Sequence, residues 1–291
     1  MLQTAIVDVA SFARLSLVCK SLAYLVATED NIWKRICLGS EYGFGAIRYA
    51  WGCSISGNAL EPDLDTFSLA SLSLSSEHKR ASSSSPFPLS STHPTYAIMF
   101  RQRPRIRFNG CYISTVNYIR PGASTASQVS WNTPVHVVTY YRYLRFFRDG
   151  SCCSLLTTAE PADVVHYLTK ENIHLHEHGQ GLLPNAVMRH ALRGRWRLSG
   201  NQQDMNDDSE KEEEEEGTLL IETEGVDPDK YIFKMELALK SAGRAGGTRN
   251  NKLNWKGFWS YNKLTDDWAE FGLRNDKAFF WSRVRGYGMG C

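Results

Sequence analysis

The sequence lacks a long apolar run, a strong net charge and a leader segment, and each absence removes a class of protein. No stretch of its 291 residues approaches the roughly 20 consecutive apolar residues that a membrane-spanning helix needs. The 33 basic and 31 acidic residues leave a net charge of +2, so bulk charge gives no reason to expect nucleic acid as a partner. No basic segment precedes an apolar core at the start of the sequence. We therefore expect a soluble protein of the cytoplasm, with the nucleus as an alternative compartment.

The seven cysteines are an odd number and form no C-x-x-C pair, which argues against a disulfide framework or a zinc site. Several lie inside apolar runs, as Cys19, Cys37 and Cys111 do, where a reduced cysteine acts as a small hydrophobic residue. Catalytic signatures are missing too, since there is no G-x-S-x-G, no Walker-type glycine loop and no H-E-x-x-H. We expect a protein that is not an enzyme and has no catalytic residues.

Three histidines, His174, His176 and His178, have a spacing that could hold a metal ion, because alternate residues of a strand face the same way. Glycine and glutamine follow them directly and favour a polar loop, and no cysteine or carboxylate completes a ligand set by spacing. The sequence therefore predicts no metal site and no cofactor.

Two amphipathic helices open the chain. Apolar residues at steps of three and four form the stripe of the first helix: Val9, Phe12, Leu15, Val18, Leu22 and Leu25. Asp8 can cap its start, and a second helix over residues 30–38 presents Ile32 and Trp33 toward the first. Two short helices cannot bury this much apolar surface between themselves, so a partner or a larger domain must cover part of it.

Two segments interrupt the periodic pattern. Residues 54–93 are rich in serine and proline and have little periodicity, which predicts a disordered insertion or linker. Residues 200–217 contain a run of acidic side chains that repel one another, and we expect a solvated loop there. The N-terminal helices at 1–40 are thus separated from a C-terminal domain at 94–291 that carries the acidic loop.

The C-terminal domain has the pattern of antiparallel strands. An Asp-Gly dipeptide at 149–150 lies between two apolar runs and predicts a two-residue hairpin turn, which would place Phe146 opposite Cys153 and Leu144 opposite Leu155. One helix, over 161–170, interrupts the strands. Other strands are expected over 105–114, 134–148, 195–199, 218–223, 230–240, 252–261, 268–273 and 278–285. About nine strands with one apolar face each favour a closed antiparallel barrel, with a sandwich as the alternative.

A closed barrel of this size could hold one small ligand, as lipocalin-like barrels do. Aromatic side chains expected to point inward could line such a cavity: Tyr112, Phe146, Trp196, Tyr231, Phe233, Trp255 and Trp259. One candidate function is therefore a lipocalin-like β-barrel that binds a small ligand or a protein.

Two sets of sequence blocks resemble a known family. LVCK at 17–20, followed by Ile-Trp at 32–33, is similar to the second half of an F-box, although MLQTAIVDVASFA lacks the Leu-Pro segment that opens a full one. Six further blocks resemble the C-terminal region of F-box only protein nine and its fungal relatives: RPRIRFNGCYIS, YIRPG, YYRYLRFFRDG with the LLTT that follows, GRWRLS, NKLNW and FFWSRVRGY.

The resemblance implies a chain of the α+β class, with partial F-box helices before a mainly antiparallel β-barrel-like domain with one inserted helix. It also implies a substrate receptor of a Skp–cullin–F-box ubiquitin ligase, which marks protein targets for proteasomal degradation. Its partners would be a Skp-type adaptor, a cullin–RING ligase and an unknown substrate. Carried over from the F-box pattern, the adaptor-binding residues are Leu17, Val18, Cys19, Ile32 and Trp33.

Overall fold

The computed structural model describes residues 9–60, 89, 93–121, 135–176, 187–200, 217–243 and 249–287. They group into two compact units, one within 1–46 and 59–103 and the other within 47–58 and 104–291. Asp8, most of the predicted serine-rich insertion and nearly all of the predicted acidic loop lie outside the described residues.

The first unit consists of α2 (Val9–Leu15), α3 (Lys20–Thr28), α4 (Asp30–Leu38) and α5 (Tyr96–Gln102). The stripe predicted for one helix is divided between α2 and α3, because a turn at 16–18 separates them. Thr95 caps α5 by accepting a hydrogen bond from the Ile98 amide at 3.2 Å. No helix among the described residues combines the length and hydropathy needed to cross a membrane.

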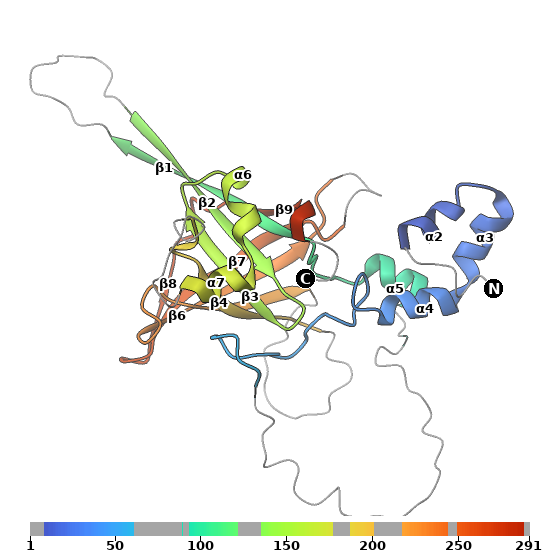
Figure 1. The fold of residues 1–291 in the computed structure, drawn as a ribbon, viewed down its shortest axis with the longest axis horizontal. Helices are drawn as coiled ribbons and strands as arrows, with labels where there is room; N and C mark the ends of the chain where they lie inside the picture. Colours follow the sequence, from blue (N-terminus) through green and yellow to red (C-terminus); the bar gives the residue numbers. More distant parts are fainter. Residues whose placement is uncertain are drawn as a thin grey trace, which may run out of the picture. The chain divides into compact units, whose positions relative to one another are not determined.

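The second unit is an antiparallel β-barrel (Figure 1). Its strands are β1 (Gly110–Pro121), β2 (Val135–Phe146), β3 (Ser151–Thr157), β4 (Leu192–Leu198), β5 (Thr218–Glu224), β6 (Tyr231–Lys240), β7 (Lys252–Asn262), β8 (Asp267–Glu270) and β9 (Phe279–Arg283). The order is β6-β5-β4-β3-β2-β1-β9-β7, and pairing of β6 with β7 closes the ring. β8 is not part of the closed ring and pairs with residues 259–262 of β7. The predicted antiparallel barrel in an α+β chain is confirmed.

The hairpin between β2 and β3 has a different register from the predicted one. Phe146 pairs with Cys152, and Arg145 pairs with Cys153. The loop has an additional residue, because the Phe147 amide bonds the Ser151 carbonyl at 2.9 Å and Gly150 takes a φ of 98°. A shift of one residue moves Cys153 to the opposite face of the sheet from Phe146.

Helices cover the outer face of the first three strands. The expected helix over 161–170 is a short α-helix, α6 (Pro161–Val164), continued by the 3-10 turn η2 (Val165–Tyr167); α7 (Lys170–His176) and the turn η4 (Arg285–Tyr287) follow later. Their apolar residues pack with an outer core on the strands: Cys111, Tyr143, Phe147, Cys153, Leu155, Val164, Leu168, Ile173, Met188, Val284 and Tyr287. This cover explains why β2 and β3 are buried on both faces.

A β-bulge changes the direction of the side chains along β7. Glu236 pairs with Gly257 and Leu237 with Trp255, so Lys256 is the additional residue. After the bulge, Trp259 pairs with Lys234 on the outer face. The predicted inward position therefore does not apply to Trp259 in this structure.

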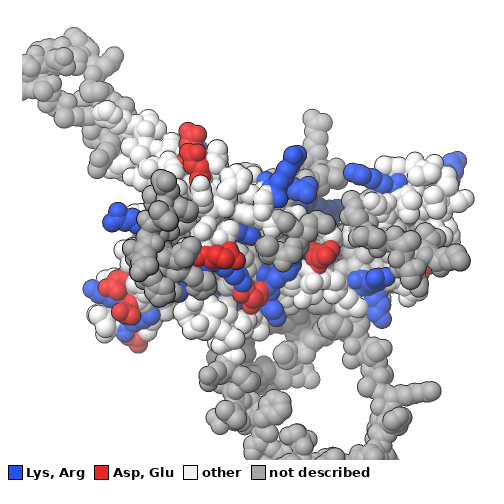
Figure 2. All heavy atoms as spheres, in the orientation of Figure 1, with Lys and Arg blue, Asp and Glu red and all other residues white. Residues whose placement is uncertain are grey.

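Positive and negative side chains are interspersed over the barrel on the face drawn in Figure 2. Cross-strand ion pairs also occur between β4 and β5, with Arg193 bound to Glu224 at 2.8 Å and Arg195 bound to Glu222 at 2.7 Å. Neither sign forms a continuous field on that face.

Candidate docking turn and barrel cavity

The turn between α2 and α3 exposes the residues that the F-box pattern singles out. α2 ends in bonds of the i to i−3 type, and the Ser16 hydroxyl donates to the Ala13 carbonyl at 2.6 Å. Leu17 is 84% exposed, Val18 is 69% exposed, and Cys19 is exposed directly before α3. Adjacent exposed apolar residues on a short turn are a candidate for protein contact.

Ile32 and Trp33 lie in the core of the helical unit, where Trp33 is only 3% exposed. The Trp33 indole donates to the Val26 carbonyl at 2.7 Å, and its ring centroid lies 5.4 Å from that of Phe12. Trp33 also contacts Phe100 of α5 at 5.5 Å. The five residues expected to bind the adaptor therefore divide into an exposed trio and a buried pair.

One half of the barrel interior is filled by aromatic side chains. Tyr112, Phe146 and Trp196 are almost fully buried, with ring centroids 5.7 Å apart for the first pair and 5.8 Å apart for the second. The Tyr112 hydroxyl donates to the Asn250 carbonyl, and the Trp196 indole donates to the Phe147 carbonyl. This packed half leaves no room for a ligand beside these three rings.

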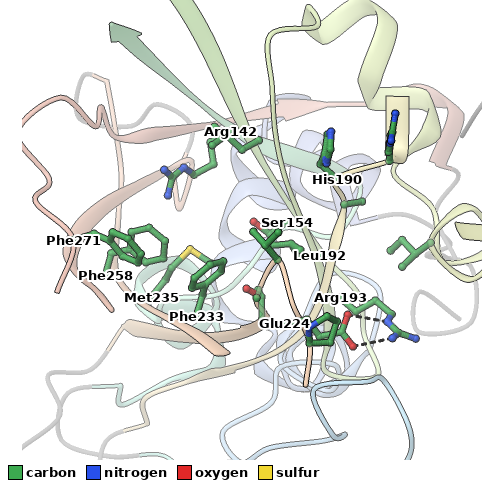
Figure 3. Close-up of a pocket in the computed structure, with 18 residues that line it drawn as sticks. Arg142, Ser154, His190, Leu192, Arg193, Glu224, Phe233, Met235, Phe258 and Phe271 are labelled. Atoms are coloured by element: carbon green, nitrogen blue, oxygen red, sulfur yellow. Dashed lines mark hydrogen bonds and ion pairs between the residues drawn. The ribbon is translucent and has the colours of Figure 1, made fainter. Parts of the chain in front are cut away.

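The other half contains a cavity of about 720 Å³ (Figure 3). Its apolar wall comes from β6, β7 and the residue after β8: Phe233, Met235, Phe258 and Phe271. Ser154 and Leu192 line the middle, and the Arg193–Glu224 ion pair lies at the other side. The volume lies within the range of small-molecule sites.

Of the seven aromatics expected to point inward, Phe233 lines this cavity. Trp255 is inward by its pairing with Leu237, and it contacts Phe258 beside the cavity wall. Tyr231 lies at the start of β6, half-buried against Gly225. Sequence reasoning missed the polar members of the wall, because an isolated serine, threonine or arginine in a strand carries no pattern of its own.

The buried cysteine thiols have raised pKa values, as expected for thiols in an apolar core. Burial raises the pKa of Cys111 and of Cys153 to about 12, and it raises the pKa of Cys152 as well. His174 and His176 lie within α7, but their side chains and all of His178 are outside the described residues. No group of three or more potential metal ligands occurs in the described part of the chain.

Comparison with known proteins gives a family match that covers the middle of the chain. Residues 90–224 match the F-box only protein C-terminal region. The F-box protein HRT3 of Saccharomyces cerevisiae is 35% identical over 189 residues, which cover 65% of this chain and 45% of that protein. The F-box protein pof7 of Schizosaccharomyces pombe is 29% identical over 195 residues, which cover 66% of this chain and 45% of that protein.

The chain spans about half the length of these curated relatives. No solved structure gives a match. The family match and both relatives agree with the blocks read from the sequence. The resemblance to the F-box only protein family that was read from the sequence is thereby confirmed.

Proposed function

We propose that this chain is a substrate-receptor subunit of a Skp–cullin–F-box ubiquitin ligase and is not itself a catalyst. In this proposal the helical unit docks on a Skp-type adaptor, and the barrel recognises protein targets for ubiquitination. The similarity to F-box only proteins supports the general role. The observation that carries the docking proposal is the exposure of Leu17, Val18 and Cys19 on the α2–α3 turn.

Ile32 and Trp33 have a supporting role in this proposal. They hold α4 against α2 and α5, which fixes the turn, while the exposed trio makes the contact. Leu17 and Val18 would be the main energetic contributors, since burying an aliphatic side chain at an interface is worth about 1.5–3 kcal/mol.

The test is binding of the purified chain to a Skp-type adaptor by calorimetry. We expect binding by the natural chain and a loss of tenfold or more when Leu17 and Val18 are both changed to lysine. Val137→Lys is the matched control, because Val137 is an exposed aliphatic residue of the barrel. Equal adaptor affinity of the Leu17 and Val18 double variant and of Val137→Lys would show that the α2–α3 turn is not part of the interface. If neither the chain nor a version preceded by a Leu-Pro helix binds, the receptor proposal fails.

Cys19 provides a second readout that requires no mutation. It is exposed, whereas Cys37, Cys53, Cys111, Cys152 and Cys153 are buried. Adaptor binding should slow alkylation of Cys19 and leave the other thiols unchanged. Unchanged alkylation of Cys19 in a complex of proven stoichiometry would place the adaptor elsewhere on the chain.

A further inference from the structure

We infer that the barrel cavity binds a neutral, mainly apolar small molecule that carries a hydroxyl or carbonyl group. The inference does not depend on the ligase proposal, because it rests on the cavity wall alone. Three features of that wall carry it: its apolar end, its hydroxyl groups, of which the buried one has no partner, and its charge balance.

The apolar end is built to contact a flat or elongated hydrophobic group. The Phe258 and Phe271 rings stack at 4.4 Å, and Phe233 meets each of them edge-on at 5.9 Å. Figure 3 shows these rings together with Met235 on one side of the cavity. Phe271 and Leu156 remain partly exposed although they line the cavity, so an apolar ligand would remove further hydrophobic surface from water.

Two hydroxyl groups lie in the wall, and the fully buried one, that of Thr223 on β5, has no hydrogen-bond partner among the described residues. Ser154 on β3 supplies the other hydroxyl and is 7% exposed. A buried polar group without a partner is unfavourable, so such groups in a cavity wall indicate a polar ligand atom or an ordered water. In the packed half of the barrel, by contrast, the Tyr112 hydroxyl and the Trp196 indole both have protein partners.

The charges around the cavity argue against an ionised group inside it. Of the charged residues that line the cavity, Arg142 lies inside, 5.1 Å from both the Trp255 and Phe258 ring centroids, and Asp276 balances it at 3.3 Å. Arg189 and His190 also line the cavity, but both are exposed. Arg193 at the edge is balanced by Glu224. A buried carboxylate or ammonium would therefore lack a compensating charge, which is far more costly than burying a hydroxyl or carbonyl.

The size of the wall residues explains why the cavity is on this side. Inward positions of β3 and β5 at this end are occupied by Ser154 and Thr223, and Thr223 pairs with Gly194 of β4. At the packed end the inward residues are large aromatics, which fill the barrel themselves. The small residues leave the space that an external molecule would occupy.

The test uses three probes of equal chain length and different charge: decan-1-ol, decanoate and decylamine at neutral pH. Calorimetry on the full chain should give binding of the alcohol at least tenfold tighter than of either ion. Ser154→Ala and Thr223→Val remove one hydroxyl each with little change of shape. Each should weaken binding of the alcohol by about threefold to tenfold, the value of one hydrogen bond.

Met235→Trp should abolish binding by filling the cavity, and Ile232→Trp on the outer face of the same strand is its matched control. If Met235→Trp does not fold, Ser154→Ala and Thr223→Val still test whether the alcohol binds in the cavity. Decanoate or decylamine binding more tightly than the alcohol would overturn the proposed ligand class. Failure of all three probes to bind, or alcohol binding that neither hydroxyl variant weakens, would overturn the site.

Discussion

Trp33 was expected from the F-box resemblance to bind the adaptor, and in the structure it is a packing residue of the helical unit. Its indole bonds the Val26 carbonyl, and its ring lies between Phe12 and Phe100, so three helices depend on it. Trp33→Ala should destabilise the helical unit by about 3–5 kcal/mol, as aromatic truncations in cores do.

The measurement is thermal unfolding followed by far-ultraviolet circular dichroism. Tyr24→Ala removes an aromatic ring that is 73% exposed and should change the free energy of unfolding by less than about 0.5 kcal/mol. Equal effects of the two substitutions would mean that Trp33 does not hold the helices together.

The cysteines also behave according to their individual surroundings. Cys111 and Cys153 have pKa values raised to about 12 by burial, so the reactive thiolate is scarce at neutral pH. We expect iodoacetamide to modify Cys19 first in the native chain and to reach Cys111 and Cys153 only after unfolding. Mass spectrometry of a time course checks this order, and early labelling of Cys153 would contradict the closed outer core.

Among the structural elements, the β2–β3 hairpin contains a carboxylate with a pH-dependent role. Burial alone would raise the pKa of Asp149, but hydrogen bonds from Lys170 and Ser151 hold it below the ordinary value of 3.8. A carboxylate with a lowered pKa in the folded state stabilises the fold above its ordinary pKa. That stabilisation is lost as the pH falls through the lowered value.

Asp149→Asn should therefore destabilise the chain near neutral pH and have progressively less effect as the pH falls below about 3.8. Urea unfolding of both proteins across this range measures the difference. Lys170→Met should remove most of this pH dependence, because it deletes a hydrogen-bond donor to Asp149. A difference that stays constant with pH would exclude this role of the carboxylate.

Strand existence could be predicted from the sequence, whereas strand register could not. Alternation of apolar residues identified most strands, including β6 and β7, because one apolar face per strand is a strong signal. The additional loop residue before Ser151 and the bulge at Lys256 each shift the pairing by one position. Such shifts depend on backbone conformation and long-range pairing, and both Cys153 and Trp259 changed faces as a result.

At the scale of the whole molecule, residues 47–58 belong with the barrel although they precede α5 in the chain. The Leu198 amide bonds the Arg48 carbonyl at 2.8 Å, and Trp51 lies against Arg195 at 4.4 Å. Cys53 and Ile47 are buried. Sequence analysis assigned the last part of this segment to a linker, since it has no periodic pattern.

Replacing residues 47–58 by a glycine-serine segment of equal length should destabilise the barrel by about 3 kcal/mol or more, from lost burial and hydrogen bonds. Calorimetric unfolding of the full chain measures the loss. The same replacement of residues 76–87, in the predicted insertion, is the control. Equal transition temperatures for both variants would show that residues 47–58 do not support the barrel.

The candidate sites were predictable to different degrees for a physical reason. The LVCK block indicated the candidate docking turn in advance, because its residues are contiguous in the sequence. The cavity is assembled from Arg142, Ser154, Thr223 and Phe258, which are far apart in the sequence and meet only after the barrel closes. Three of the expected aromatics, Tyr112, Phe146 and Trp196, instead fill the opposite half, whereas Phe233 lines the cavity.

The division of the barrel interior has a consequence for how sequences of this fold can vary. Aromatic packing around Trp196 stabilises one half, so residues such as Ser154 and Met235 in the other half can change without removing the main core. A single scaffold could thus acquire new ligand preferences through a few substitutions at one end while the other end preserves foldability.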